Sequence, residues 1–93
     1  MPSEPNSTTL GEVTVRYFAA ARAAAGVETE RVPVTDGGSI DDVLAALRAR
    51  HGARLTEVLT ASSLLLDEVA VRDRTVAVPV GAVLDVLPPF AGG

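Results

Sequence analysis

Residues 39–51 carry the signal that most constrains the fold, an amphipathic helix whose start and stop are both visible. Ser39 is a suitable N-cap, and Asp41 and Asp42 lie in the first turn, near the positive end of the helix dipole. The last turn is basic and Gly52 follows it, which is typical of a helix end. The apolar residues recur at helical spacing along one face: Ile40, Val43, Leu44 and Leu47. A helix with one apolar stripe needs a second layer, so we expect it to cover a sheet.

Alternating apolar residues predict the strands of that sheet. Residues 12–18 alternate between two faces, and residues 28–34 form a weaker second strand. Pro33 lacks the N–H that a strand ladder needs, so the second strand is expected at a sheet edge. Residues 83–87 form the last strand, which stops because two prolines follow it. The strand residues expected to face the helix are Val13, Val15, Tyr17, Leu84 and Val86.

Shorter signals complete the outline. Residues 19–25 fit one helical turn, and the apolar spacing in residues 53–60 predicts a second, short helix. An acidic pair at 67–68 separates "SLLL" from "VAV", which form either two short strands or one bent strand. We therefore expect a single α+β domain over residues 12–87, a disordered leader over 1–11 and a flexible tail over 88–93.

Composition excludes several classes of function. The chain has no cysteine, which rules out disulfides and cysteine–zinc sites, and its one histidine cannot form a metal site alone. All eight basic residues are arginine and the net charge is −4, which argues against nucleic-acid binding because such proteins need clustered cations. No apolar run approaches the ~18 residues of a transmembrane helix, and no signal peptide is visible, so we expect a cytoplasmic protein.

The side chains offer no convincing catalytic centre. We expect His51, at the helix end, to be a solvated cap, and the charges of Asp41 and Asp42 to serve the helix dipole. The "DGGS" at residues 36–39 precedes a helix, as phosphate-binding loops do, but it has neither GxGxxG nor GxxxxGK[ST] spacing. A turn into a helix explains it better.

The final segment, "PPFAGG", is the strongest functional candidate. Its prolines favour an extended tail root, its phenylalanine is an apolar anchor, and glycine suits a narrow channel because it has no Cβ. The terminal carboxylate becomes reactive once a partner converts it to an acyl adenylate. We therefore expect the Gly93 carboxylate to carry the chemistry. The tail residues expected to dock into the partner are Pro88, Pro89, Phe90, Ala91 and Gly92.

A second candidate lies beside the tail root. If the alternation is correct, Phe18 and Leu87 point away from the helix and form an apolar spot among charged residues. Exposed apolar patches often mark a partner surface, but scattered apolar surface residues are also normal. At this point both interpretations stay open.

Two stretches give the chain a family resemblance. "VRYFAAARAAAG" contains an F-A-x-x-R segment followed by glycine, and "VLPPFAGG" contains an apolar-P-P-x-x-G-G ending. Over residues 12–93 the chain resembles the MoaD/ThiS sulfur-carrier family of ubiquitin-like proteins, most of all its molybdopterin synthase branch. It departs from the family pattern at Ala23, where glutamate is usual, and at Ala82, where aspartate usually follows the glycine.

The resemblance implies a β-grasp fold, in which a mixed sheet packs on one main helix and the first and last strands are parallel neighbours. It also implies that a MoeB-like enzyme adenylates Gly93 with ATP, and that sulfur then replaces AMP to give a thiocarboxylate. A MoaE-like large subunit would receive the tail that carries the thiocarboxylate. The chain itself would be non-catalytic and would bind no cofactor. The predicted partner interface comprises Phe18, Ala70 and Leu87.

Three alternatives stay open beside this interpretation. The chain could be a sulfur carrier for cysteine or thiamin synthesis, although the paired prolines favour the molybdopterin branch. It could be a protein modifier joined through Gly93 to substrate lysines. It could also be a ubiquitin-like binding module that uses the face of Phe18 and Leu87 and has an idle tail.

Overall fold

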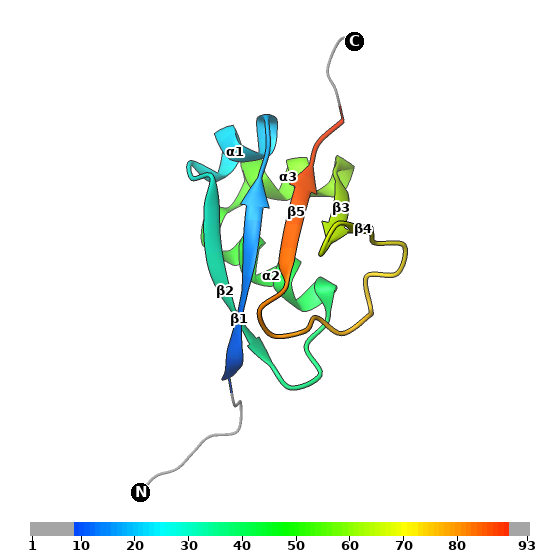
Figure 1. Cartoon of the computed structure of the whole chain (residues 1–93). Helices are drawn as coiled ribbons and strands as arrows, with labels where there is room; N and C mark the ends of the chain where they lie inside the picture. Colours follow the sequence, from blue (N-terminus) through cyan, green and yellow to red (C-terminus); the bar gives the residue numbers. More distant parts are fainter. Residues whose placement is uncertain (1–8, 90–93) are drawn as a thin grey trace, which may run out of the picture.

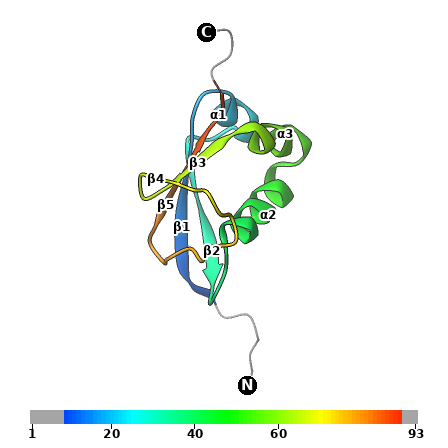
Figure 2. The same ribbon diagram turned by 90° about the vertical axis from the view of Figure 1, so that its right-hand side faces the viewer.

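The computed structural model describes residues 9–89, which form one mixed sheet with helices packed on one of its faces (Figures 1 and 2). The two-layer arrangement and the mixed sheet confirm the α+β prediction. In chain order the elements are β1 (Thr9–Tyr17), α1 (Ala20–Ala25), β2 (Thr29–Thr35), α2 (Ile40–His51), α3 (Ala53–Ala61), β3 (Ser63–Leu66), β4 (Val69–Ala70) and β5 (Val83–Leu87).

The strand order is β2-β1-β5-β3-β4, with β1 and β5 as parallel neighbours and every other pairing antiparallel. β2 lies at one edge, where Pro33 is exposed opposite Glu12. Both the edge position of the second strand and the parallel pairing of the first and last strands are thereby confirmed. The parallel pairing sets Tyr17 opposite Val86, so β1 and β5 finish at the same end of the sheet.

β1 begins earlier than the expected domain boundary at residue 12. Thr9 already pairs with Thr35 on β2, and the register shifts before Gly11. A Cβ on Gly11 would lie 2.5 Å from Cγ1 of Val80, so glycine allows the strand to pass close to this loop. Strand pairing therefore begins inside the range predicted as a leader, and residues 1–8 lie outside the described part of the chain.

α2 has the expected start and stop. Ser39 Oγ accepts the N–H of Asp42 at 3.2 Å, and the Asp42 carboxylate accepts the N–H of Ser39 at 2.9 Å, which makes a capping box. Gly52 ends the helix at a φ of 82°, and its N–H donates to the Arg48 carbonyl at 2.8 Å. The predicted apolar stripe is at most 3% exposed: Ile40, Val43, Leu44 and Leu47.

The chain after α2 forms a second helix and a hairpin. α3 buries Leu55 and Leu59, which confirms the predicted short helix. β3 and β4 are two antiparallel strands rather than one bent strand, and Asp67 and Glu68 make the turn with φ angles of 47° and 70°. Asp67 also exchanges two hydrogen bonds with Val83: its carboxylate accepts the Val83 N–H and its own N–H donates to the Val83 carbonyl, both at 2.8 Å. These bonds hold the turn against the start of β5.

The core lies between the sheet and the helices. The strand residues predicted to face the helix are each at most 1% exposed: Val13, Val15, Tyr17, Leu84 and Val86. Burial of an aliphatic side chain of this kind contributes about 1.5–3 kcal/mol, so this layer supplies much of the folding free energy. The side view shows helices on this face only, which leaves the opposite face of the sheet without a helical cover (Figure 2).

Candidate docking face and tail root

The three residues of the predicted partner interface lie on the face of the sheet opposite the helices. Phe18 follows the end of β1, its N–H donates to the Val86 carbonyl at 3.3 Å, and its ring lies beside the Arg16 guanidinium. Leu87 points to the same side because its neighbour Val86 is in the core, and both Phe18 and Leu87 are partly exposed. Ala70 on β4 is exposed and pairs with Leu65, which pairs with Asp85. We call this surface the open face.

An ion pair crosses the open face between β1 and β5. Arg16 donates from Nε to one oxygen of Asp85 at 2.6 Å and from Nη2 to the other at 2.8 Å. The Asp85 side chain is only 7% exposed, whereas that of Arg16 is 43% exposed and covers it. The hydrogen bond with Asp85, and then its negative charge, raise the pKa of Arg16 above its usual range. The Arg16 guanidinium carbon also lies 5.9 Å from the centre of the Phe18 ring.

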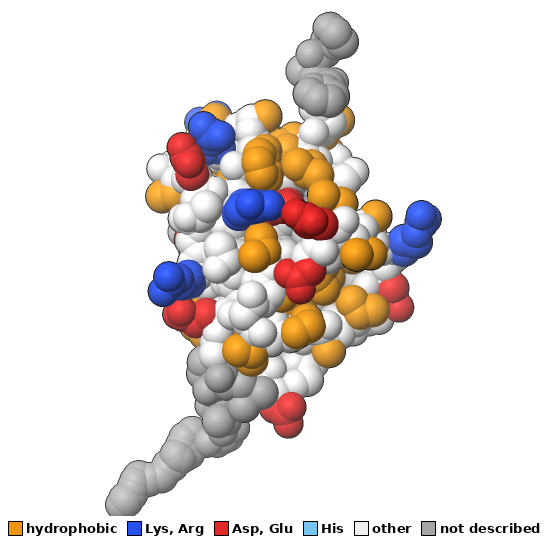
Figure 3. Space-filling model, viewed as in Figure 1, with side chains coloured by type: hydrophobic (Ala, Val, Ile, Leu, Met, Phe, Trp, Pro, Cys, Tyr) orange, Lys and Arg blue, Asp and Glu red, His pale blue; other side chains and the backbone are white. Residues whose placement is uncertain are grey.

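Apolar and charged side chains share this surface. Figure 3 views the molecule from the side of Figure 1 and shows hydrophobic side chains gathered where β5 ends, with basic and acidic side chains next to them. A depression of about 310 Å³ adjoins the ion pair and is lined by Arg16, Asp67, Glu68 and Val83. The surface is therefore mixed in character, in contrast with the apolar layer beneath the helices.

The tail root continues from the end of β5. β5 ends at Leu87, Pro88 is partly buried, and Pro89 is exposed. Neither proline has an N–H that could extend the ladder, which explains the end of the strand. The functional predictions for Phe90, Ala91, Gly92 and Gly93 lie outside the described residues and stay predictions.

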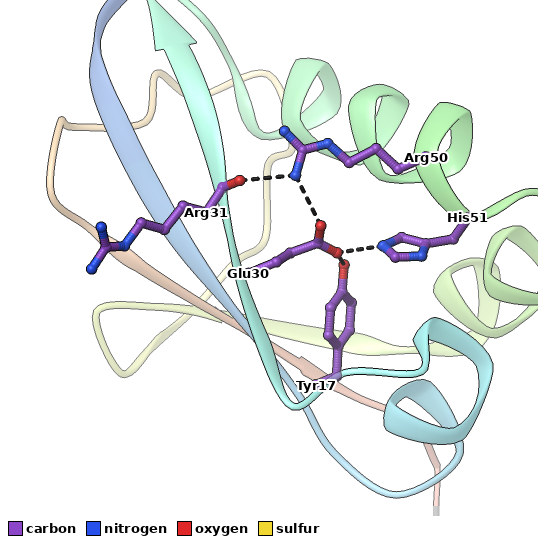
Figure 4. Close-up of polar contacts among 5 residues, drawn as sticks. All are labelled: Tyr17, Glu30, Arg31, Arg50 and His51. Atoms are coloured by element: carbon purple, nitrogen blue, oxygen red, sulfur yellow. Dashed lines mark hydrogen bonds and ion pairs between the residues drawn. The ribbon is translucent and has the colours of Figure 1, made fainter.

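His51 is not the solvated cap that the sequence suggested. Its side chain is 17% exposed, and its Nε2 lies within hydrogen-bonding distance of the Glu30 carboxylate (Figure 4). The Tyr17 hydroxyl donates to the same carboxylate, and Arg50 donates to it at 2.9 Å and to the Arg31 carbonyl at 2.8 Å. The rings of Tyr17 and His51 meet edge to face, with centroids 6.0 Å apart. We call Tyr17, Glu30, Arg50 and His51 the polar cluster.

The polar cluster joins β1, β2 and α2 on the helix side of the sheet. Burial alone raises the pKa of Glu30, but the hydrogen bonds from Tyr17, His51 and Arg50 outweigh it and lower that pKa below its usual value. Burial, and then the bond to Glu30, raise the pKa of Tyr17. One sequence signal could have revealed this cluster. Glu30 shares the inward face of β2 with Val32 and Val34, and a carboxylate at a core-facing position needs partners.

Within residues 9–89, no group of three or more His, Cys, Asp or Glu side chains is arranged to hold a metal ion. None of the helices in this range has the length and apolar character needed to cross a membrane.

Comparison with known proteins extends the observations on the fold. A curated relative, the "Molybdopterin synthase sulfur carrier subunit" of Chlamydomonas reinhardtii, is 32% identical over 83 residues, which are 88% of this chain and 99% of that protein. The crystal structure of SAMP1 from Haloferax volcanii matches with a TM-score of 0.80 at 28% identity, over 89% of this chain and 100% of that one. The neighbours have the ubiquitin-like β-grasp fold, so that prediction is confirmed.

A third match is a solved "protein-protein complex of subunit 1 and 2 of Molybdopterin-converting factor" from Helicobacter pylori. Its TM-score is 0.66 at 22% identity, over 88% of this chain and 99% of that one, so it supports the fold alone. The sequence model of the ThiS family matches residues 15–93, a range that includes β5 and the terminal "PPFAGG". The chain therefore belongs to the ThiS family.

Proposed function

We propose that this protein is a sulfur carrier, the small subunit of a molybdopterin synthase, and that it works through the carboxylate of Gly93. The observation that carries the proposal is the family match, which runs through the terminal glycines to residue 93. The Chlamydomonas reinhardtii relative named as a molybdopterin synthase sulfur carrier subunit supports this branch of the family. In this role the chain is not an enzyme on its own but supplies the group that reacts.

The proposed chemistry takes place at the backbone terminus. The Gly93 carboxylate attacks the α-phosphorus of ATP in a MoeB-like partner, pyrophosphate leaves, and an acyl adenylate forms. A sulfide-level donor then attacks the carbonyl carbon and AMP leaves, which gives a thiocarboxylate. The thiocarboxylate sulfur forms a bond to a carbon of a pterin precursor and displaces an oxygen substituent there. Water then cleaves the acyl–sulfur bond, which leaves the sulfur on the pterin and restores the Gly93 carboxylate. ATP is bound by the partner, and this chain needs no cofactor of its own.

The tail root and the open face suit the chain to this role. Pro88 and Pro89 hold the first part of the tail extended, which lowers the entropy lost when the tail enters a channel. Gly92 and Gly93 have no Cβ, so the backbone passes through a narrow site. Phe18, Ala70 and Leu87 would meet a MoaE-like large subunit beside that channel. The Helicobacter complex of subunits 1 and 2 is a precedent for such an assembly.

One alternative is favoured by a specific finding. The SAMP1 structure shares this fold at 28% identity, and a second structure of that Haloferax volcanii protein gives its full name, small archaeal modifier protein 1. A modifier would use the same adenylate and then form an amide bond with a lysine of another protein. The two functions differ in what accumulates, which is either a thiocarboxylate or a ladder of conjugates. A carrier for cysteine or thiamin synthesis would also form the thiocarboxylate, and the identity of the sulfur acceptor distinguishes it.

The experiment is to incubate the chain with the activating enzyme, ATP and a sulfur donor, and to weigh the intact protein. The wild-type chain should gain the mass difference of sulfur for oxygen at its C-terminus. Deletion of Gly93 and extension by one residue should both prevent this gain, since either moves the reacting carbon by about 3.5 Å. Gly92→Val should fold normally and also fail, because its branched side chain restricts the backbone and fills the channel. An unmodified wild-type mass would contradict the proposal.

A further inference from the structure

The Arg16–Asp85 ion pair is an unusual feature for a surface that is expected to dock a partner. It lies within the predicted interface, with the Phe18 ring beside it and with Leu65 and Ala70 following Asp85 along the same row of the sheet. Most charged groups at interfaces lie at the rim, whereas this pair lies among the apolar residues of the open face. A partner that covers Phe18, Leu87 and Ala70 must therefore also cover Arg16.

A partner that covers Arg16 would withdraw its guanidinium group from water. A guanidinium group has five N–H donors, and the two bonds to Asp85 leave the others free to meet a partner. The Arg16 side chain is 43% exposed, so part of it is open to a partner. Asp85 itself is satisfied and only 7% exposed, so it keeps Arg16 in place without reaching the partner. Burial of the free donors without an acceptor would cost binding free energy, so the partner must supply one.

The charges around Arg16 indicate which acceptor fits. The guanidinium already shares its charge with the Asp85 carboxylate, and Glu68 lines the same depression of about 310 Å³. Asp67 lines it too, with its carboxylate bonded to the Val83 N–H. A carboxylate from the partner would be a further anion around a single cation. An uncharged oxygen, such as a main-chain or side-chain carbonyl, meets the same donors without this repulsion.

We propose that Arg16, held in place by Asp85, sets the partner specificity of the open face, and that the partner presents an uncharged carbonyl oxygen to it within an otherwise apolar surface. The inference rests on the proposed function, because the partner is taken to be the large subunit that receives the tail. Arg16 is a specificity-determining residue here and takes no part in the sulfur chemistry.

The test is isothermal titration of the chain into the molybdopterin synthase large subunit from the same genome. The principal variant, Arg16→Leu with Asp85→Leu, removes the pair without leaving a lone buried charge. It should melt at or above the wild-type temperature yet bind about tenfold more weakly, because the partner's carbonyl loses its donors. Glu12→Leu with Arg31→Leu removes a different ion pair, 3.9 Å long, between β1 and β2, and is the matched control with unchanged affinity.

Further variants distinguish a failure of this inference from a failure of the proposed function. Wild-type or tighter affinity for the Arg16→Leu, Asp85→Leu variant would overturn the inference, provided that Leu87→Asp abolishes binding. Wild-type affinity for Leu87→Asp would instead remove the docking face, and with it this part of the proposed function. Glu68→Gln should change affinity by less than about threefold. A tenfold gain for Glu68→Gln would indicate a partner carboxylate and overturn the uncharged acceptor. A wild-type dimer that Leu87→Asp disperses would assign the face to a second copy and overturn the inference as well.

Discussion

The two faces of the sheet handle polar groups in opposite ways. On the helix side, Glu30 on β2 is surrounded by donors from two other elements, β1 and α2, so the polar cluster is closed within the protein. On the open face, Asp85 is equally enclosed, but its partner Arg16 is half exposed and keeps free donors. The polar groups on the helix side thus find their hydrogen-bond partners within the protein, whereas Arg16 on the open face has donors left for another molecule. This difference separates the part of the sequence that specifies the fold from the part available for recognition.

The largest expected effect is on the helix side. Leu44→Ala should reduce the free energy of unfolding by about 2–5 kcal/mol, because Leu44 is 0% exposed and its removal leaves a cavity between α2 and the sheet. Denaturant unfolding followed by circular dichroism measures this loss. Ala45→Gly, at an exposed position of the same helix, serves as the control and should cost about 1 kcal/mol. An unchanged midpoint for Leu44→Ala would mean that this face is not the core.

The polar cluster should give a smaller, pH-dependent effect. Because the folded-state pKa of Glu30 is lowered, its stabilisation is present above the unfolded-chain pKa of about 4.3 and is lost as the pH falls through the folded-state value. Glu30→Gln should therefore lose about 1–2 kcal/mol at neutral pH, and its difference from wild type should shrink in acid. Thermal melts between neutral and acid pH test this, with exposed Glu57→Gln as control. A difference that stays constant across the range would contradict the role of the carboxylate.

Loss of Arg16 alone should reduce the free energy of unfolding by less than either Leu44→Ala or Glu30→Gln. Arg16→Leu leaves the Asp85 carboxylate buried without its partner, so the melting temperature should drop. The second change, Asp85→Leu, should restore it because no uncompensated charge remains. Melting of the single and double variants forms a cycle that isolates the pair. A double variant no more stable than Arg16→Leu would show that Asp85 does not depend on Arg16.

The smallest effect on stability should come from Leu87. Leu87→Asp changes a partly exposed side chain on the open face, so the free energy of unfolding should move by less than about 0.5 kcal/mol. Binding of the large subunit should nevertheless be lost, because a carboxylate enters an apolar contact. Paired measurement of melting and affinity checks both halves of this prediction. A strongly destabilised Leu87→Asp domain would place Leu87 in the core. It would contradict the assignment of stability to the helix side and of binding to the open face.

Local signals in the sequence predicted most of the fold. Ser39, Asp42 and Gly52 define α2 through hydrogen bonds between residues close in sequence, and Pro33 marks the edge strand. The start of β1 was missed because Thr9 gains strand structure from pairing with Thr35, which lies far along the chain. The hairpin turn was ambiguous because Asp67 and Glu68 adopt positive φ angles that their residue types rarely take.

The candidate site was predictable in outline only. Alternation placed Phe18 and Leu87 on the open face, whereas no pattern in the sequence singled out Ala70. The sequence did not show that Asp85 would be nearly buried, because that depends on Arg16 reaching it from a strand 69 positions away. His51 was misjudged for the same reason, since Glu30 and Tyr17 reach it from other elements. Polar groups whose partners are distant in sequence are the common cause of these misses.

The most direct test of the central claim uses a chain that keeps both faces and lacks only the terminal glycines. The two subunits, the activating enzyme, ATP, a sulfur donor and the pterin precursor are combined, and formation of the sulfurated pterin is measured. The account predicts full conversion with the wild-type chain and none with the chain lacking Gly92 and Gly93, although both should bind the large subunit through the open face. Equal conversion by the shortened chain would contradict the account and leave a binding module in its place.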